Sequence, residues 1–172
     1  ARVLKLGIKI GEGSERTCYE DPADSDKCIK LSELNKNKQT LREINYLKKL
    51  PVAAFEEGAI PKFYGVIEGA GKLGIVQQLI RDSDGSYAKS LSHYIKQGLD
   101  RQILKQALLQ LRDTLILHNI IPCDLNGDNI LLQKSNEDYQ AVLIDGFGAT
   151  EAIPLVQWFR FLGRRKIQRK WE

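Results

Sequence analysis

Two aspartates and one asparagine near the middle of the chain have the residue types that bind a metal ion. Asp124 is followed five residues later by Asn129, at the start of the apolar stretch 130–133. A polar turn and a second apolar stretch, 140–144, then lead to Asp145. A hairpin of these stretches brings the three side chains together, where they could orient a hydroxyl group and hold a divalent cation on phosphates. Asp, Asn and Gly are also ordinary turn residues, so a hairpin without chemistry remains the alternative.

Length and composition suit one compact domain or two small lobes, since the chain has 172 residues, 42% of them hydrophobic. There is no run of about 18 apolar residues of the kind that spans a membrane. Residues 1–5 lack the long apolar core of a secretory signal. Cys18, Cys28 and Cys123 are widely spaced, with only two histidines as companions, which predicts buried reduced thiols rather than a zinc site. The sequence thus predicts a soluble, cytoplasmic protein without a transmembrane segment.

The N-terminal part predicts a hairpin with a glycine turn. Residues 3–10 alternate apolar and polar side chains, Gly11-Glu12-Gly13-Ser14 makes the turn, and a loop over 21–26 leads to another strand, 27–31. Glycines present bare backbone N–H groups, so this turn can approach phosphates closely. A tight turn without a ligand is the alternative.

Lys30 and Glu43 are charged residues in apolar surroundings. Lys30 is inside the strand 27–31, and Glu43 shares one stripe of the predicted helix 36–50 with Tyr46, Leu47 and Leu50. Burying an unpaired charge is expensive, so Glu43 should meet a buried cation, and Lys30 is the nearest candidate. The alternative is that both side chains face solvent.

The remaining elements predict an α+β chain with a change of character near residue 80. Strands are predicted at 63–68 and 73–79, a polar boundary at 81–88, and helices at 91–97 and 102–118. We therefore expect an N-terminal lobe over 1–80 and a reduced C-terminal lobe over 81–172. A last helix is expected to begin near Pro154.

The order of these features resembles the site of protein kinases: glycine hairpin, strand lysine, helix glutamate, Asp-x4-Asn before a strand, then Asp-Gly. Within that class the chain is most similar to the bacterial YrbL family, that of the PhoP regulatory network protein. The segments that carry this closer likeness are G-E-G-S-E-R-T-C-Y-E-D-P, C-I-K-L, D-L-N-G-D-N-I-L-L-Q and I-P-L-V-Q-W. The resemblance implies a kinase-like two-lobe fold with a truncated C-terminal helical lobe.

The same resemblance implies ATP and Mg²⁺ as ligands. Gly11, Gly13 and Ser14 would belong to the loop that covers the ATP phosphates. Lys30 would pair with the α- and β-phosphates and be oriented by Glu43.

The resemblance also assigns roles nearer the reacting atoms. Gln77, Gln78 and Leu79 would form the hinge against which adenine stacks and hydrogen-bonds. Asp124 would accept the proton of the attacking hydroxyl, and Asn129 and Asp145 would hold Mg²⁺.

The chain departs from the kinase pattern in several places. Arg16 replaces the third glycine of the loop, and Pro122-Cys123 replaces the usual His-Arg before the catalytic aspartate. Asn126 replaces a lysine that commonly contacts the γ-phosphate, and Asp-Gly-Phe-Gly beginning at Asp145 replaces Asp-Phe-Gly. Only 27 of the 172 residues follow Asp145, so the activation segment and most of the helical lobe are expected to be absent.

Two functions follow from these features. The first is an active minimal phosphotransferase that acts on a hydroxyl group of a protein or of a small molecule. The second is a pseudokinase that binds nucleotide as a regulator or scaffold with little turnover.

A third interpretation concerns the tail alone, where six basic residues fall between Arg160 and Lys170 beside Trp158, Phe159, Leu162 and Trp171. This basic C-terminal helix is a candidate for an anionic partner, such as a membrane surface, a nucleic acid or an acidic protein. A helix that only caps the shortened lobe is the alternative.

Overall fold

The computed structural model describes residues 4–146 and 148. The chain divides into two compact units, the first formed by Ala1–Leu50 and Lys62–Leu79 and the second by Pro51–Pro61 and Ile80–Glu172. The sequence places the boundary between residues 80 and 81, next to the change of unit after Leu79. The described elements are α-helices and antiparallel strands, which confirms the α+β class.

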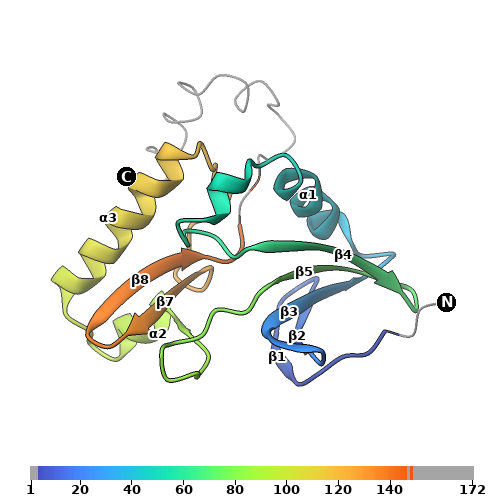
Figure 1. Cartoon of the computed structure of the whole chain (residues 1–172), viewed down its shortest axis with the longest axis horizontal. Coiled ribbons are helices and arrows are strands. Elements are labelled where there is room, and N and C mark those ends of the chain that lie inside the picture. The colour runs from blue at the N-terminus through green and yellow to red at the C-terminus, as the bar shows by residue number, and fades with distance from the viewer. Residues whose placement is uncertain (1–3, 147, 149–172) are drawn as a thin grey trace. The chain divides into compact units, whose positions relative to one another are not determined.

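A five-stranded antiparallel sheet forms the first unit, in the order β1-β2-β3-β5-β4, with α1 over one of its faces (Figure 1). The strands are β1 Lys9–Glu12, β2 Thr17–Asp21, β3 Asp24–Glu33, β4 Phe63–Gly69 and β5 Lys72–Gln78, and the helix is α1 Lys38–Leu47.

Two predictions for the first unit are wrong in their boundaries. The first strand begins at Lys9 rather than residue 3, although Gly7 already donates a backbone hydrogen bond to Glu20 at 3.0 Å. Its pairing with β2 is irregular between Lys9 and Gly11, and Ile8 is 68% exposed, so the apolar alternation overstated the strand. The loop predicted over 21–26 is a tight turn, because the Asp21 side chain accepts a hydrogen bond from the Ala23 N–H at 2.9 Å.

The face that α1 covers is the face that carries Lys30. In an antiparallel pair, residues opposite each other point to the same side, and Cys18 and Ile75 are the partners of Lys30 in β2 and β5. Two residues further along β3, the Ser32 hydroxyl donates to the Thr40 hydroxyl of α1 at 3.0 Å. The strand period thus places Lys30 under α1.

The second unit combines a three-stranded antiparallel sheet, order β6-β7-β8, with short and long helices (Figure 1). Its elements are the 3-10 turn η1 Val52–Phe55, β6 Lys89–Ser90, α2 Leu91–Lys96, α3 Arg101–Leu117, β7 Ile130–Ser135 and β8 Asp138–Leu143. Helix α3 buries Ala107, Leu111 and Leu115, which recur at helical spacing along one face. Ser90 caps α2 and Asp100 caps α3 through their side-chain oxygens.

The connection Pro51–Pro61 belongs to this second unit because it is bonded to β8. The Leu143 N–H donates to the Ala59 carbonyl at 2.8 Å, and the Gln140 side chain donates to the Glu57 carbonyl at 2.9 Å. The prediction from sequence assigned this segment to the N-terminal lobe, because these hydrogen bonds join residues more than 80 positions apart. The helix expected near Pro154 lies outside the described residues.

Candidate functional site

The end of β1 and the loop that follows it carry two glycines, Gly11 and Gly13, that the described backbone does not require. A Cβ added at Gly11 would meet no heavy atom within 4 Å, and one added at Gly13 would find Arg16 O at 3.7 Å. Neither glycine has a positive φ, and both are exposed together with Ser14. The Gly13 N–H donates to the Arg16 carbonyl at 2.7 Å and closes the loop. The loop therefore presents bare, open backbone, which is the surface that a phosphate can approach closely.

Lys30 and Glu43 are buried and paired. Their exposed fractions are 7% and 3%, and Lys30 Nζ lies 3.9 Å from Glu43 Oε1. On α1, Glu43 shares its buried face with Thr40, Tyr46 and Leu47. The solvent-facing alternatives are therefore wrong, and the predicted pairing is confirmed. Contact of Lys30 with a nucleotide stays a prediction.

Arg16 is a third member of this cluster, and the sequence interpretation missed it. It is 7% exposed, and its guanidinium donates to Glu43 Oε2 in a buried ion pair. The kinase comparison treated Arg16 only as a lost glycine. The position of Arg16 could have been predicted from the sequence, because Arg16 precedes Cys18 by two residues and the strand period puts both on the face of Lys30.

The residues expected to contact adenine lie at the end of β5. Gln77 is buried opposite Cys28, and the Gln78 N–H donates to the Lys62 carbonyl at 2.9 Å. The Leu79 N–H donates to the Asp26 carbonyl at 2.8 Å. Both N–H groups are thus used within the first unit, so a hinge role for Gln78 and Leu79 would rest on their other atoms.

Asp124 lies exposed in a loop that Asn126 organises. The Asn126 side chain donates to Asp124 Oδ2 at 2.8 Å, while its own oxygen accepts from the Asp128 and Asn129 N–H groups at 2.9 and 3.1 Å. Asn129 Nδ2 donates to the same Oδ2 at 3.2 Å and to the Asp124 carbonyl at 3.2 Å. One carboxylate oxygen of Asp124 is therefore held by two amides. The sequence interpretation considered Asn126 only as the replacement of a lysine. Its role in organising the loop could have been predicted, because asparagine in a loop commonly forms an Asx turn.

Gly146 brings the other predicted metal ligand to this loop. The Cys123 and Asp124 N–H groups donate to the Gly146 carbonyl at 2.5 and 3.0 Å, and the Ile144 N–H donates to the Asn129 carbonyl at 2.9 Å. A Cβ added at Gly146, whose φ is +72°, would lie 2.4 Å from Asp124 O. Asp145, half-buried, also accepts from the Gly146 N–H at 2.7 Å. The hairpin thus brings Asp124, Asn129 and Asp145 to one place, as predicted from their spacing.

These donors have the chemistry of a Mg²⁺ site, in which one or two carboxylates act with waters and substrate phosphates. Asn129 uses its amide nitrogen toward Asp124, and within the described residues its Oδ1 accepts no hydrogen bond. Residues 4–146 and 148 contain no group of three or more His, Cys, Asp or Glu placed to hold a metal. The predicted site needs no such group, because Asn129 and Asp145 would supply one amide oxygen and one carboxylate, and phosphates and waters would supply the other ligands. The residue types present therefore fit Mg²⁺, and its binding stays a prediction.

Two cysteines of the first unit lie beside Lys30. Cys18 and Cys28 are free, and Cys28 is buried whereas Cys18 and Cys123 are half-buried, which corrects the expectation of three buried thiols. The neighbouring Cys28 side chain, with Lys30 and Arg16 nearby, lowers the pKa of Cys18. The proximity of Cys18 and burial raise the pKa of Cys28, whose thiol donates to the Gln78 carbonyl at 3.8 Å. We therefore expect Cys18 to be the more reactive thiol of the pair.

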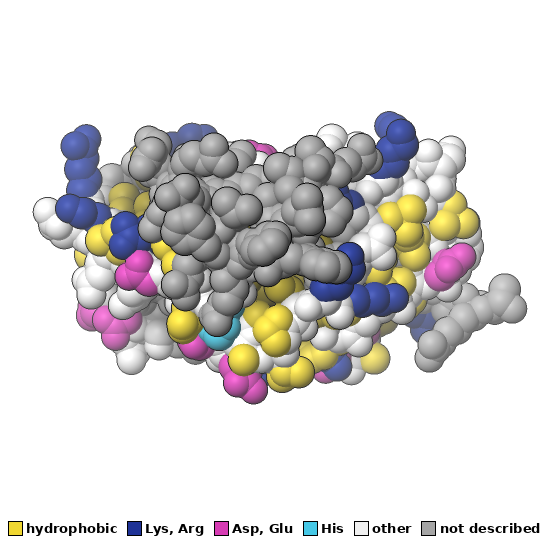
Figure 2. Space-filling view, turned by 90° about the horizontal axis from the view of Figure 1, so that it is seen from above, with side chains coloured by type: hydrophobic (Ala, Val, Ile, Leu, Met, Phe, Trp, Pro, Cys, Tyr) yellow, Lys and Arg dark blue, Asp and Glu magenta, His cyan; other side chains and the backbone are white. Residues whose placement is uncertain are grey.

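Figure 2 shows Lys and Arg side chains dispersed among acidic and hydrophobic ones on one face of the described chain. The basic residues of the predicted C-terminal helix lie outside the described residues, as do Trp158, Phe159, Leu162 and Trp171. Among the helices of the described part, none has the length and apolar character needed to cross a membrane.

Comparison with known proteins identifies relatives along nearly the whole chain. The sequence profile of the PhoP regulatory network protein YrbL family matches residues 4–172. Proteins of Escherichia coli (strain K12) and Shigella flexneri, each named "Uncharacterized protein YrbL", are 30% identical over 170 residues. Each match covers 95% of this chain and 81% of the relative. Both relatives are bacterial, and their names describe no activity.

Proposed function

We propose that this chain, which belongs to the family of the PhoP regulatory network protein YrbL, is an ATP- and Mg²⁺-dependent phosphotransferase of reduced kinase-like fold. The observation that carries the proposal is the buried pair of Lys30 and Glu43, joined at 3.9 Å beneath α1. Lysine and glutamate are almost never fully buried unless paired. A hydrophobic pair would fill the same space without desolvating two charges, so a role in binding an anion explains this one.

The proposed division of roles follows the chain. The bare loop of Gly11, Gly13 and Ser14 covers the phosphates, and Lys30, held by Glu43, neutralises part of their charge. Phosphoryl transfer needs positioning and electrostatic stabilisation more than covalent help from the protein. A lysine held in place and a loop of open backbone supply both.

The second unit supplies the remaining roles. Asn129 and Asp145 would hold Mg²⁺, which neutralises the charge that develops on the transferred group. The oxygen of an acceptor hydroxyl attacks the γ-phosphorus, the bond to the leaving ADP oxygen breaks, and the hydroxyl proton passes to Asp124. Asp124 Oδ2 is held by Asn126 and Asn129, which fixes the carboxylate and leaves Oδ1 to take that proton.

The acceptor in this proposal is a hydroxyl group of a protein or of a small molecule in the cytoplasm. Adenine would be bound near Gln78 and Leu79, through groups other than their N–H donors, which the sheet already uses.

A nucleotide-binding regulator with little turnover is the second candidate, and the geometry of Glu43 favours it. Glu43 Oε2 is bound by Arg16, whereas Oε1 makes no hydrogen bond and lies 3.9 Å from Lys30. A carboxylate that Lys30 shares with Arg16 is not reserved for the lysine, so the cluster can bind phosphates and still position the γ-phosphate poorly. Both functions require nucleotide binding, and they differ in turnover: the phosphotransferase transfers phosphate, whereas the regulator turns over little.

The test is incubation of the purified protein with γ-labelled ATP and Mg²⁺, comparing wild type with Asp124→Asn. The matched control is Asp128→Asn, an exposed carboxylate in the same loop; among the described residues its side chain forms no hydrogen bond or ion pair. Wild type and the control should transfer or release label alike, and Asp124→Asn should be slower by about 10²–10⁴-fold. Equal rates of label transfer or release in wild type, Asp124→Asn and Asp128→Asn would overturn the role of Asp124. Nucleotide binding without label release would establish the regulator instead.

A further inference from the structure

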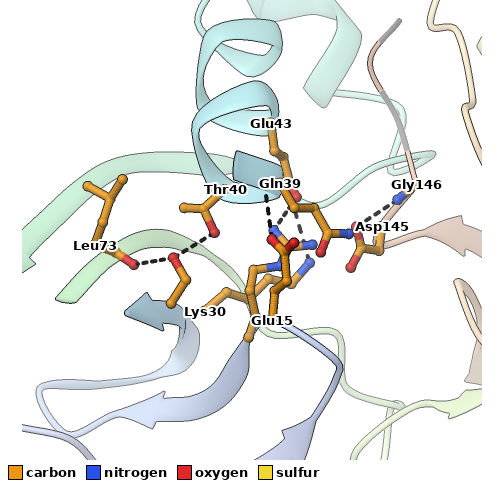
Figure 3. Close-up of polar contacts among 10 residues, drawn as sticks. Glu15, Lys30, Gln39, Thr40, Glu43, Leu73, Asp145 and Gly146 are labelled. Carbon is orange, nitrogen blue, oxygen red and sulfur yellow. Dashed lines mark hydrogen bonds and ion pairs between the residues drawn. The ribbon is translucent and has the colours of Figure 1, made fainter. Parts of the chain in front are cut away.

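The loop after the glycines holds α1 at two points, one helical turn apart (Figure 3). Glu15 Oε2 accepts a hydrogen bond from the Gln39 N–H at 3.2 Å, and Arg16 donates to Glu43. Gln39 and Glu43 are four residues apart and lie on the same side of the helix. Consecutive loop residues thus contact consecutive turns of α1.

The Glu15 contact compensates for a weakness in the helix itself. Asn37, at the N-cap of α1, makes no side-chain capping bond, and the first turn of α1 contains no acidic residue. The first N–H groups of a helix lack internal partners and carry partial positive charge. Glu15 satisfies one of these groups and places a carboxylate at this end of α1, so the loop provides the cap that the helix sequence lacks.

The Arg16 contact determines how the Glu43 carboxylate is oriented. Arg16 and Glu43 are 7% and 3% exposed, and Arg16 is bound to Oε2 at hydrogen-bonding distance. Lys30 is 3.9 Å from Oε1, which accepts no hydrogen bond. A rigid guanidinium directs a carboxylate more firmly than a flexible ammonium does. Arg16 therefore has the stronger hold on Glu43.

We propose that Glu15 and Arg16 clamp α1 to the glycine loop, and that Arg16 is a positioning residue that orients Glu43 and, through it, Lys30. This inference rests on the proposed nucleotide site and adds a residue to it. The clamp makes the loop and the helix move together, so closure of the loop on phosphates also orders α1. In kinases the corresponding lysine–glutamate pair must be in place for activity. In this chain the glycine loop, through Glu15 and Arg16, holds the lysine–glutamate pair in place.

The first experiment needs no nucleotide. Hydrogen exchange of the α1 amides is compared between wild type, Glu15→Ala, Arg16→Gln and the control Glu12→Ala. Glu12 is an acidic residue of the same loop region that pairs with Lys9 rather than with α1. Exchange in α1 should be at least tenfold faster in the two clamp variants and unchanged in the control. Unchanged exchange in Glu15→Ala and Arg16→Gln would overturn the clamp.

The second experiment separates positioning from simple stability. Affinities for Mg²⁺–ATP and for adenosine are measured by titration calorimetry with wild type, Arg16→Gln and Arg16→Lys. If Arg16 acts through Glu43 on the phosphates, Arg16→Gln weakens ATP binding at least tenfold and adenosine binding less than twofold. Arg16→Lys keeps the charge but loses the planar guanidinium, so it should recover only part of the ATP affinity; full recovery would mean that charge alone, and not the direction given by the guanidinium, is what Arg16 supplies.

The outcomes also distinguish this inference from the proposed function. An equal loss of ATP and adenosine affinity in Arg16→Gln would mean a purely structural role and would overturn positioning. If wild type binds neither compound, the proposed function fails, and the exchange experiment alone still decides whether the clamp exists.

Discussion

Glu43→Gln tests the buried cluster most sharply, because glutamine has the same shape and lacks the charge. Glu43 is 3% exposed and is the carboxylate that lies against both Arg16 and Lys30. Removing one partner of a buried ion pair typically costs about 3–5 kcal/mol. Opposite unit charges 3.9 Å apart attract by about 4 kcal/mol at an effective dielectric of about 20, before desolvation.

The expected result for Glu43→Gln is a loss of about 3 kcal/mol of unfolding free energy, since the glutamine amide still fits the space and retains an acceptor oxygen. Urea unfolding without nucleotide measures this loss. The matched control is Glu68→Gln, an exposed glutamate of β4 in the same unit, which should change stability by less than about 0.5 kcal/mol. A loss below about 1 kcal/mol in Glu43→Gln would refute the reasoning that Glu43 is the buried counter-charge of the cluster.

Three further predictions follow from the described geometry. The double variant Gly11→Ala, Gly13→Ala should have an unchanged or slightly raised thermal midpoint, because a Cβ has room at both positions. The same variant should bind ATP at least tenfold more weakly, as measured by calorimetry. Cys18 should be alkylated by iodoacetamide faster than Cys28. Because the pKa of Cys18 is lowered, its alkylation rate should rise at a lower pH than that of an ordinary thiol. Cys28→Ala should shift this rise in rate to higher pH, and Cys28→Ser, which keeps a hydrogen-bond donor, should shift it less. Gly146→Ala should destabilise the protein by about 2 kcal/mol in urea unfolding, since the new Cβ would lie 2.4 Å from a backbone carbonyl at a φ of +72°.

Each of these three has a result that contradicts it. Unchanged ATP affinity in the double alanine variant would remove the argument that the open glycines serve a ligand. Equal alkylation rates for the two thiols at every pH would contradict the lowered pKa of Cys18. A stability of Gly146→Ala equal to that of wild type would mean that the turn is not as close to the loop of Asp124 as described.

The pairing of Lys30 with Glu43 could be predicted because two independent periodicities intersect there. Lys30 is flanked by apolar residues within its strand, and the apolar stripe of the helix contains one glutamate. The convergence of Asp124, Asn129 and Asp145 was predictable for a similar reason, since a hairpin must bring its two ends together. Local pattern and burial are sufficient for such inferences.

Three other features were missed or misplaced, each for a different reason. Arg16 was missed because the strand period was not continued back through the turn that precedes Thr17. The membership of Pro51–Pro61 in the second unit depends on hydrogen bonds to β8, distant in sequence. The start of the first strand was wrong because apolar alternation over 3–10 continues past the residues that pair with β2.

The proposed chemistry rests on the resemblance to kinases and on the side chains of Lys30, Asn129 and Asp145. The most direct test is titration of the purified protein with ATP in the presence and absence of Mg²⁺, alongside Lys30→Met and Asp145→Asn. The account predicts Mg²⁺-dependent binding by wild type, weaker by at least tenfold in Lys30→Met, and loss of the Mg²⁺ dependence in Asp145→Asn. Absence of ATP binding by the folded wild-type protein at millimolar nucleotide and Mg²⁺ would contradict it.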